Sequence, residues 1–147
     1  MKLSNREATD MMQRRTPLPL GGNFVVSGRA VVIHTNCAVI LREACKASLL
    51  TPVGDAQHGP AMQWEIVGSL DTRPVEGWDS NVTLAGRSLY LSMGPQQWFA
   101  FDLETHQGAG FVTVCATGPN RNTNTQRYLL SIARNVTAGL RSEVGIV

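Results

Sequence analysis

The chain has 147 residues, a size that suits one domain with a single hydrophobic core. Hydrophobic residues make up 43% of the chain, which excludes a disordered protein, and the formal charge of +2 is too small to imply nucleic acid or an anionic membrane as the partner. No apolar run is long enough to span a bilayer, and residues 1–20 lack the apolar core of a secretory signal, so we expect a cytoplasmic protein without membrane contact.

Residues 1–20 are mostly polar and end in a Pro-x-Pro stretch, in which Pro17 and Pro19 favour an extended backbone. The pair Gly21-Gly22 then marks the start of the folded part. We therefore expect a flexible N-terminal tail over residues 1–20 and a single domain over residues 21–147.

The first predicted element is a strand over residues 23–36, where β-branched residues are frequent, with a bend at Gly28. A helix is predicted over residues 37–49, capped by Asn36 or Thr35 and ended by Pro52 and Gly54. Apolar residues of this helix other than Val39 fall on one arc of a helical wheel, and its charged residues cluster opposite: Arg42, Glu43 and Lys46.

Four further strands are predicted from apolar and polar alternation or from short apolar runs between turn residues, over residues 62–68, 87–93, 97–103 and 110–116. Residues 71–81 are predicted to form a long connection. A second helix covers residues 125–140, with Asn124 or Thr125 as its cap. Helical spacing predicts its buried face: Tyr128, Leu129, Ile132, Ala133, Val136 and Leu140.

The order of these elements is β-α-β-β-β-β-α. A helix between a first strand and a run of strands indicates an α+β fold. We therefore expect a mostly antiparallel sheet of about five strands with two amphipathic helices against it.

Several common chemistries lack their motifs in this chain. There is no GxxxxGK[ST] phosphate loop, no GxGxxG, no HExxH and no GxSxG, so no cofactor is expected. The cysteines at 37, 45 and 115 form no CxxC pair, which argues against a disulfide scaffold and a cysteine-only zinc site. We expect free thiols.

Asp102, Glu104 and His106 stand two residues apart, just ahead of Gly108. On a regular strand such residues share a face, and an Asp–His pair with a second carboxylate could perform acid–base catalysis. The same residues also lie where the chain must reverse, and Gly108 could supply the positive φ of a hairpin turn. The sequence favours the turn, with Phe99, Phe101 and Leu103 facing the core.

His34 and Cys37 have a His-x-x-Cys spacing, and His58 lies in a following loop. A zinc site needs three or four convergent ligands, and His34 ends a strand while Cys37 opens a helix. The sequence therefore favours the absence of a metal.

Arg127, Arg134 and Arg141 recur every seven residues on the polar face of the second helix. This spacing is typical of a solvated face, or of a linear basic surface for an acidic partner. No aromatic stacking platform accompanies the stripe, which argues against nucleic acid. Trp78, in the polar loop EGWDSN, can pack on the protein or dock on a partner.

The segments RAVVIHTNCAVILREACKASLL, MQWEIV, RSLYLSM and WFAFDLETHQGAGFV, followed by a long helix, resemble a known arrangement. Over residues 22–140 they are similar to the small domain that precedes the kinase core in bacterial proteins related to the histidine-containing phosphocarrier (HPr) kinase. The phosphate-loop kinase domain of that family is absent, so the resemblance implies a non-catalytic accessory or sensory module.

We therefore expect a non-catalytic binding or regulatory module that acts through protein contacts, with Arg127, Arg134, Arg141 and Trp78 as binding residues. The alternatives are a small cofactor-free enzyme that uses Asp102 and His106 with help from Glu104, and a structural protein that self-associates through a sheet edge.

Overall fold

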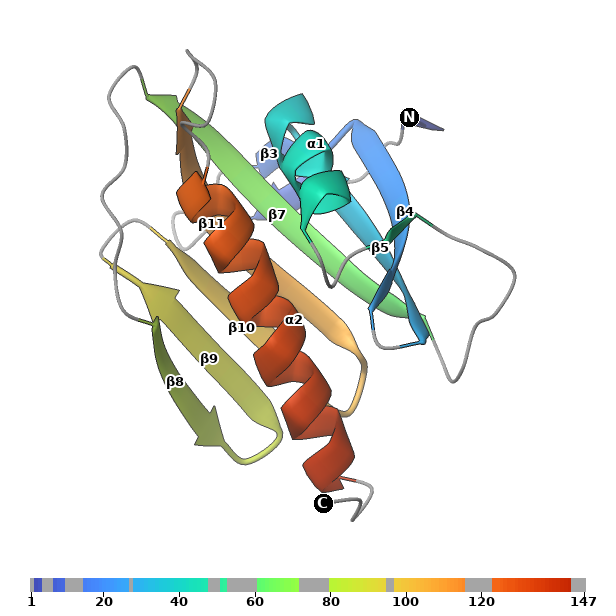
Figure 1. The fold of residues 1–147 in the computed structure, drawn as a ribbon, viewed down its shortest axis with the longest axis vertical. Coiled ribbons are helices and arrows are strands. Elements are labelled where there is room, and N and C mark those ends of the chain that lie inside the picture. The colour runs from blue at the N-terminus through green and yellow to red at the C-terminus, as the bar shows by residue number, and fades with distance from the viewer. Residues whose placement is uncertain are drawn as a thin grey trace.

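The computed structural model describes residues 2–3, 7–9, 15–26, 28–47, 51–52, 61–71, 80–94, 97–115 and 123–143 (Figure 1). Two helices are present in this part of the chain, α1 (Ala38–Lys46) and α2 (Thr123–Glu143). The longer strands are β4 (Leu20–Val26), β5 (Arg29–Thr35), β7 (Met62–Asp71), β8 (Ser80–Ala85), β9 (Ser88–Met93), β10 (Trp98–Asp102) and β11 (Gln107–Cys115). The short strands are β1 (Lys2–Leu3), β2 (Glu7–Thr9), β3 (Arg15–Pro17) and β6 (Thr51–Pro52).

The longer strands form one mixed sheet in the order β4-β5-β7-β11-β10-β9-β8 (Figure 1). This confirms the α+β class and the two helices, but the expected number of about five strands is wrong, and the sheet is not purely antiparallel. β7 is parallel to both β5 and β11. The first parallel pair arises because α1 carries the chain back across the sheet between β5 and β7, as parallel neighbours require.

The strand predicted over residues 23–36 is instead part of an antiparallel hairpin. β4 and β5 pair from Leu20 with Thr35 to Val26 with Arg29. Gly28 has a φ of 81°, a left-handed conformation that glycine adopts without a steric penalty. The glycine predicted to bend a strand therefore lies in the turn that reverses the chain.

The predicted N-terminal tail contains three of the short strands. β1 pairs with β4 at the edge of the main sheet, and β2 pairs with β3 in a separate two-stranded sheet. β4 begins at Leu20, next to the predicted domain boundary. The flexibility of residues 1–20 stays a prediction.

Both helices cover the same face of the sheet (Figure 1). Alternate residues of the strands point into this layer and are buried, among them Trp64 on β7 and Phe99 on β10, whose rings meet edge to face at 5.6 Å. Phe101 and Leu103 are also buried, as predicted. The predicted apolar face of α2 is confirmed, with every member buried: Tyr128, Leu129, Ile132, Ala133, Val136 and Leu140.

Glu43 joins the two helices, although the wheel placed it on the solvated side of α1. Its side chain is only 4% exposed, and its carboxylate accepts a hydrogen bond from Gln126 Nε2 of α2 at 2.6 Å. Arg42 and Lys46 lie 3.5 and 3.6 Å from the same carboxylate. The charge is buried with partners, as a buried carboxylate requires.

The start of α1 differs from the predicted cap. Cys37 is the N-cap residue and makes no side-chain capping bond. Thr35 Oγ1 accepts from the backbone N–H of Cys37, whereas the Asn36 amide bonds both backbone groups of Gly68 on β7, at 2.8 and 3.0 Å. Asn36 therefore ties the helix entrance to the sheet.

α2 packs closely against β10 and β11 at Gly110. The Tyr128 hydroxyl donates to the Trp98 carbonyl oxygen at 2.6 Å, and burial holds the pKa of Tyr128 well above its ordinary value of 10.0. A Cβ at Gly110 would meet that hydroxyl, the Phe99 ring and the Trp98 carbonyl oxygen. The absence of a side chain at Gly110 thus leaves room for the Tyr128 hydroxyl.

Candidate functional site

Asp102 lies at the end of β10 and organises the turn to β11. Its Oδ1 accepts from the backbone N–H groups of Glu104 and Thr105, at 2.8 and 3.3 Å, and its carbonyl oxygen accepts from His106 N. Asp commonly closes turns in this way. The positive φ of the turn, 59°, falls on His106, not on the predicted Gly108, which lies within β11.

The backbone hydrogen bond from Glu104 lowers the pKa of Asp102 below its ordinary value of 3.8, and Thr105 adds to the effect. Because the pKa of Asp102 is lower in the folded state, its ionised carboxylate stabilises the fold at pH values above 3.8. This stabilisation is lost as the pH falls through the folded-state pKa. We expect Asp102→Ala to lower the unfolding midpoint at neutral pH but not at a pH below the folded-state pKa. Denaturant titrations across this range, with Asp102→Asn as the control that keeps an acceptor, test this. A pH-independent difference would contradict the role of the carboxylate.

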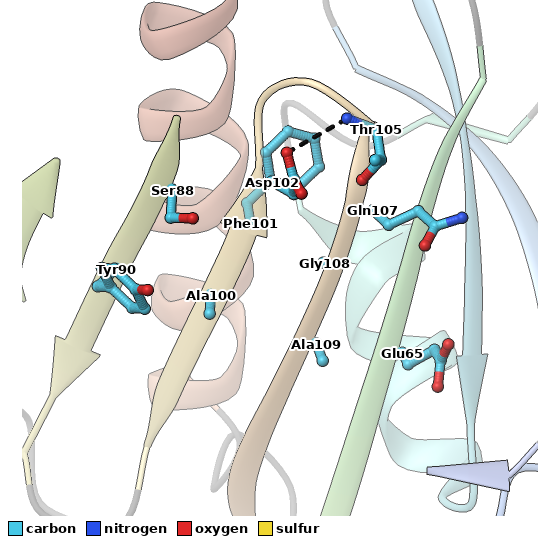
Figure 2. A pocket seen from close by; sticks show the side chains of 10 residues that line it. All are labelled: Glu65, Ser88, Tyr90, Ala100, Phe101, Asp102, Thr105, Gln107, Gly108 and Ala109. Atoms are coloured by element: carbon cyan, nitrogen blue, oxygen red, sulfur yellow. Dashed lines mark hydrogen bonds between the residues drawn. The ribbon is translucent and has the colours of Figure 1, made fainter. Parts of the chain in front are cut away.

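A shallow depression of about 290 Å³ lies beside this turn, on the sheet face opposite the helices (Figure 2). Its floor is formed by small residues of β10 and β11, and Asp102 lies at one end. The described residues around it are Glu65, Ser88, Tyr90, Ala100, Phe101, Asp102, Thr105, Gln107, Gly108 and Ala109. Glu104 and His106 do not line this depression, so the three residues of the candidate catalytic cluster do not meet in it.

The candidate metal ligands also lie apart. His34 is half-buried and its Nε2 lies 3.2 Å from Gln63 Oε1, whereas Cys37 is buried at the start of α1. His58 lies outside the described residues. Within the part of the chain that the structure describes, no three His, Cys, Asp or Glu side chains gather as a metal site would require. Cys37 and Cys45 are free thiols, and the side chain of Cys115 lies outside the described set.

Arg127 and Arg134 line the same groove. The groove has a volume of about 400 Å³ and runs between α2 and the strands β8 and β9. Its described lining is Ser80, Met93, Arg127, Leu130, Ser131, Arg134 and Asn135. Both arginines are exposed, and neither has a hydrogen-bond or ion-pair partner in the described part of the chain. The side chain of Arg141 and all of Trp78 lie outside the described residues.

The strand β8 next to this groove was missed in the sequence, which predicted a connection up to residue 81. β8 forms the last strand of the described sheet, and all its residues are exposed. Val82 pairs with Leu91 and Leu84 with Leu89, so both side chains lie on the helix-covered face, beyond the reach of α2, at 42% and 56% exposure. The signal was the alternation in NVTLA followed by Gly86-Arg87, which is typical of a two-residue hairpin.

Two exposed aromatic side chains lie on the opposite face of the sheet. Tyr90 and Trp98 are each 49% exposed, and Trp98 pairs directly with Phe111 on β11. Trp64, by contrast, is fully buried in the core. The arginine-lined groove and the exposed aromatic residues thus belong to different faces of the molecule.

No protein family, curated protein or solved structure matches this chain. Neither described helix combines the length and the apolar character needed to cross a membrane.

Proposed function

We propose that this chain is a non-catalytic binding module that recognises a partner protein through the α2–β8 surface, which we define as the groove with Arg127 and Arg134 together with Val82 and Leu84. The observation that supports it best is that both arginines line one groove and have no ionic partner among the described residues. Arg141 and Trp78 stay predicted contributors.

The composition of this surface fits a protein interface. Exposed arginines add little to the stability of a fold, but their planar guanidinium groups bind carboxylates with two parallel hydrogen bonds. Val82 and Leu84 add exposed apolar area beside them. Arginine is enriched in interfaces, and apolar side chains form their buried centre.

Two other ligand classes fit less well. Binding of single-stranded nucleic acid combines basic side chains with stacking aromatic residues, but Tyr90 and Trp98 lie on the face opposite the arginines. Catalysis by Asp102 would use a carboxylate that already closes a turn. A catalytic role for Asp102, Glu104 and His106 together stays a prediction.

The test is a charge reversal on the groove. We expect Arg127→Glu with Arg134→Glu to keep the unfolding midpoint, because surface substitutions usually change stability by less than about 0.5 kcal/mol. The same variant should bind the partner protein at least about tenfold more weakly, which corresponds to a loss of about 1.4 kcal/mol of binding free energy. Quantitative affinity capture from the native host, compared with the wild-type chain, measures this.

Two control variants belong to this experiment. Arg87→Glu reverses a charge in the β8–β9 turn, outside the groove lining, and should retain the partner. Arg127→Lys with Arg134→Lys keeps the charge but loses the two-pronged hydrogen bonding, and should bind more weakly than wild type. Recovery of the same proteins in the same amounts by wild type and double Glu variant would refute the proposal.

The wider setting is also part of the proposal. We place the module in the cytoplasm, as an accessory domain that works with a separate partner. The similarity of its element order to the domain before the HPr-kinase core agrees with this, and stays a prediction.

A further inference from the structure

We infer that the partner of the α2–β8 surface is an extended acidic segment that pairs antiparallel with β8 as an additional strand. This inference rests on the proposed function and names the class of partner. It follows from the backbone at the edge of the sheet, from the direction of the side chains around it, and from the charge of the groove.

The backbone of β8 directs hydrogen-bonding groups away from β9 at alternate residues, and no other described strand pairs with β8. Gly86, with a φ of 60°, and Arg87 form a two-residue turn between the paired residues Ala85 and Ser88. The pair flanking such a turn exchanges both hydrogen bonds, and bonded pairs then alternate along the ladder. Ala85, Thr83 and Asn81 therefore bond to β9, whereas the N–H and C=O groups of Leu84, Val82 and Ser80 point away from the sheet.

An incoming antiparallel strand would place its side chains predictably. Residues directly opposite Val82 and Leu84 would exchange backbone hydrogen bonds with them and project from the same face of the sheet. That face is the one on which the groove opens, with Ser80 of β8 in its lining. Arg127 and Arg134 are seven residues apart, which is about 10 Å along the helix axis. In a strand, acidic residues two or four positions apart are separated by about 7 or 13 Å, and the long, flexible arginine side chains can make up the difference.

The charge of the surface selects an acidic partner over a second copy of this chain. β8 consists of Ser80-Asn-Val-Thr-Leu-Ala85 and carries no carboxylate. A pair of β8 strands from two copies would therefore leave the guanidinium groups of Arg127 and Arg134 without anions. Edge strands usually carry charges or proline that prevent pairing, and β8 has neither, which is expected of an edge that accepts a strand.

The probe is a synthetic peptide in which glutamate and valine alternate. It has about eight residues, a usual length for a strand. Fluorescence anisotropy should show binding to the full chain that weakens with added salt. Replacing glutamate by lysine in the peptide should abolish binding, and Arg127→Glu with Arg134→Glu should weaken it at least about tenfold. Equal binding of both peptides would overturn the inference.

Backbone methylation tests the strand pairing itself. In the antiparallel arrangement the glutamates opposite Val82 and Leu84 point their N–H groups at β8, and the valines point theirs at solvent. Peptides N-methylated at glutamate should not bind, whereas peptides N-methylated at valine should bind as the parent does. The opposite result, or equal effects, would overturn the antiparallel pairing.

A matched pair of variants tests β8. Val82→Pro removes an outward N–H that the sheet does not use, so the fold should remain and peptide binding should fall. Thr83→Val, which changes a side chain on the other face, should bind like wild type. If light scattering shows a wild-type dimer that Val82→Pro converts to a monomer, a second copy occupies β8 and the inference is wrong. If the acidic peptides fail while affinity capture still yields an arginine-dependent partner, this inference falls and the proposed function stands.

Discussion

Trp64→Ala is expected to lower the free energy of unfolding by about 3–5 kcal/mol, the usual cost of removing a large buried aromatic side chain. Trp64 has no exposed surface and lies on β7, an interior strand of the sheet. Its ring packs edge to face on Phe99 at 5.6 Å, an arrangement that adds to the effect of burial alone. Urea denaturation of wild type and variant measures the difference.

Two controls separate burial from other properties of this residue. Trp98→Ala removes the same side chain from a half-exposed position on the opposite face and should cost about 1 kcal/mol. Trp64→Phe should cost less than Trp64→Ala, because phenylalanine leaves a smaller cavity in the core. Both changes remove Trp64 Nε1, a buried donor with no hydrogen-bond partner among the described residues, so its loss does not separate the two variants. Equal losses for Trp64→Ala and Trp98→Ala would contradict the structure of the core.

Gly110→Val is expected to destabilise the fold by about 3 kcal/mol or more, since overpacking costs rise when the neighbours cannot move. A side chain here would meet the Phe99 ring and the backbone oxygen of Trp98, which the sheet holds in place. The gain from restricting the unfolded chain, about 0.4–1 kcal/mol, is too small to compensate. Thermal and denaturant unfolding measure the loss.

The neighbouring residue provides the control for this substitution. Ala109 is exposed on the other face of β11, so Ala109→Val should change stability little. Tyr128→Phe removes the hydroxyl that a Cβ at Gly110 would meet, at the cost of its hydrogen bond to Trp98. The double variant Gly110→Val with Tyr128→Phe should therefore lose less free energy of unfolding than the sum of the two single variants. Strict additivity would argue against a contact between the side chain at position 110 and the Tyr128 hydroxyl.

The sequence predicted those elements whose periodicity is strong. Alternation in residues 88–93 and helical spacing in α2 correspond directly to the buried residues that the structure shows. The alternation of Phe99 and Phe101 with Asp102 predicted which side chains enter the core and that Asp102 lies outside it. In each case a buried face forces one register on the chain.

The wrong predictions concern features that depend on tertiary contacts and not on the local propensity of the chain. β8 is exposed throughout and lacks the buried half of an alternating pattern, so its strand signal was weak. The parallel pairing of β7 with β11 depends on where a distant strand returns, which local patterns do not encode. Glu43 was expected in solvent because its partner Gln126 comes from the other helix.

The candidate site was predictable only in part. Heptad spacing selected Arg127 and Arg134, and the structure places them in one groove. The groove itself depends on how far α2 extends over the sheet beside β8, which is a property of packing. The strand β8, which forms the second wall of the groove, had only a weak signal in the sequence, the short alternation in NVTLA before Gly86-Arg87.

The position of β7 between two parallel neighbours has a consequence for folding kinetics. β8, β9, β10 and β11 pair with strands adjacent in sequence, so this four-stranded meander can form through short-range loop closures. The β7–β11 ladder joins distant parts of the chain, such as Gln63 with Gln107, and loop-closure entropy opposes such pairing until both partners are ordered. We expect the meander to act as the template on which β7, and with it the β4–β5 hairpin, docks in a later and slower step.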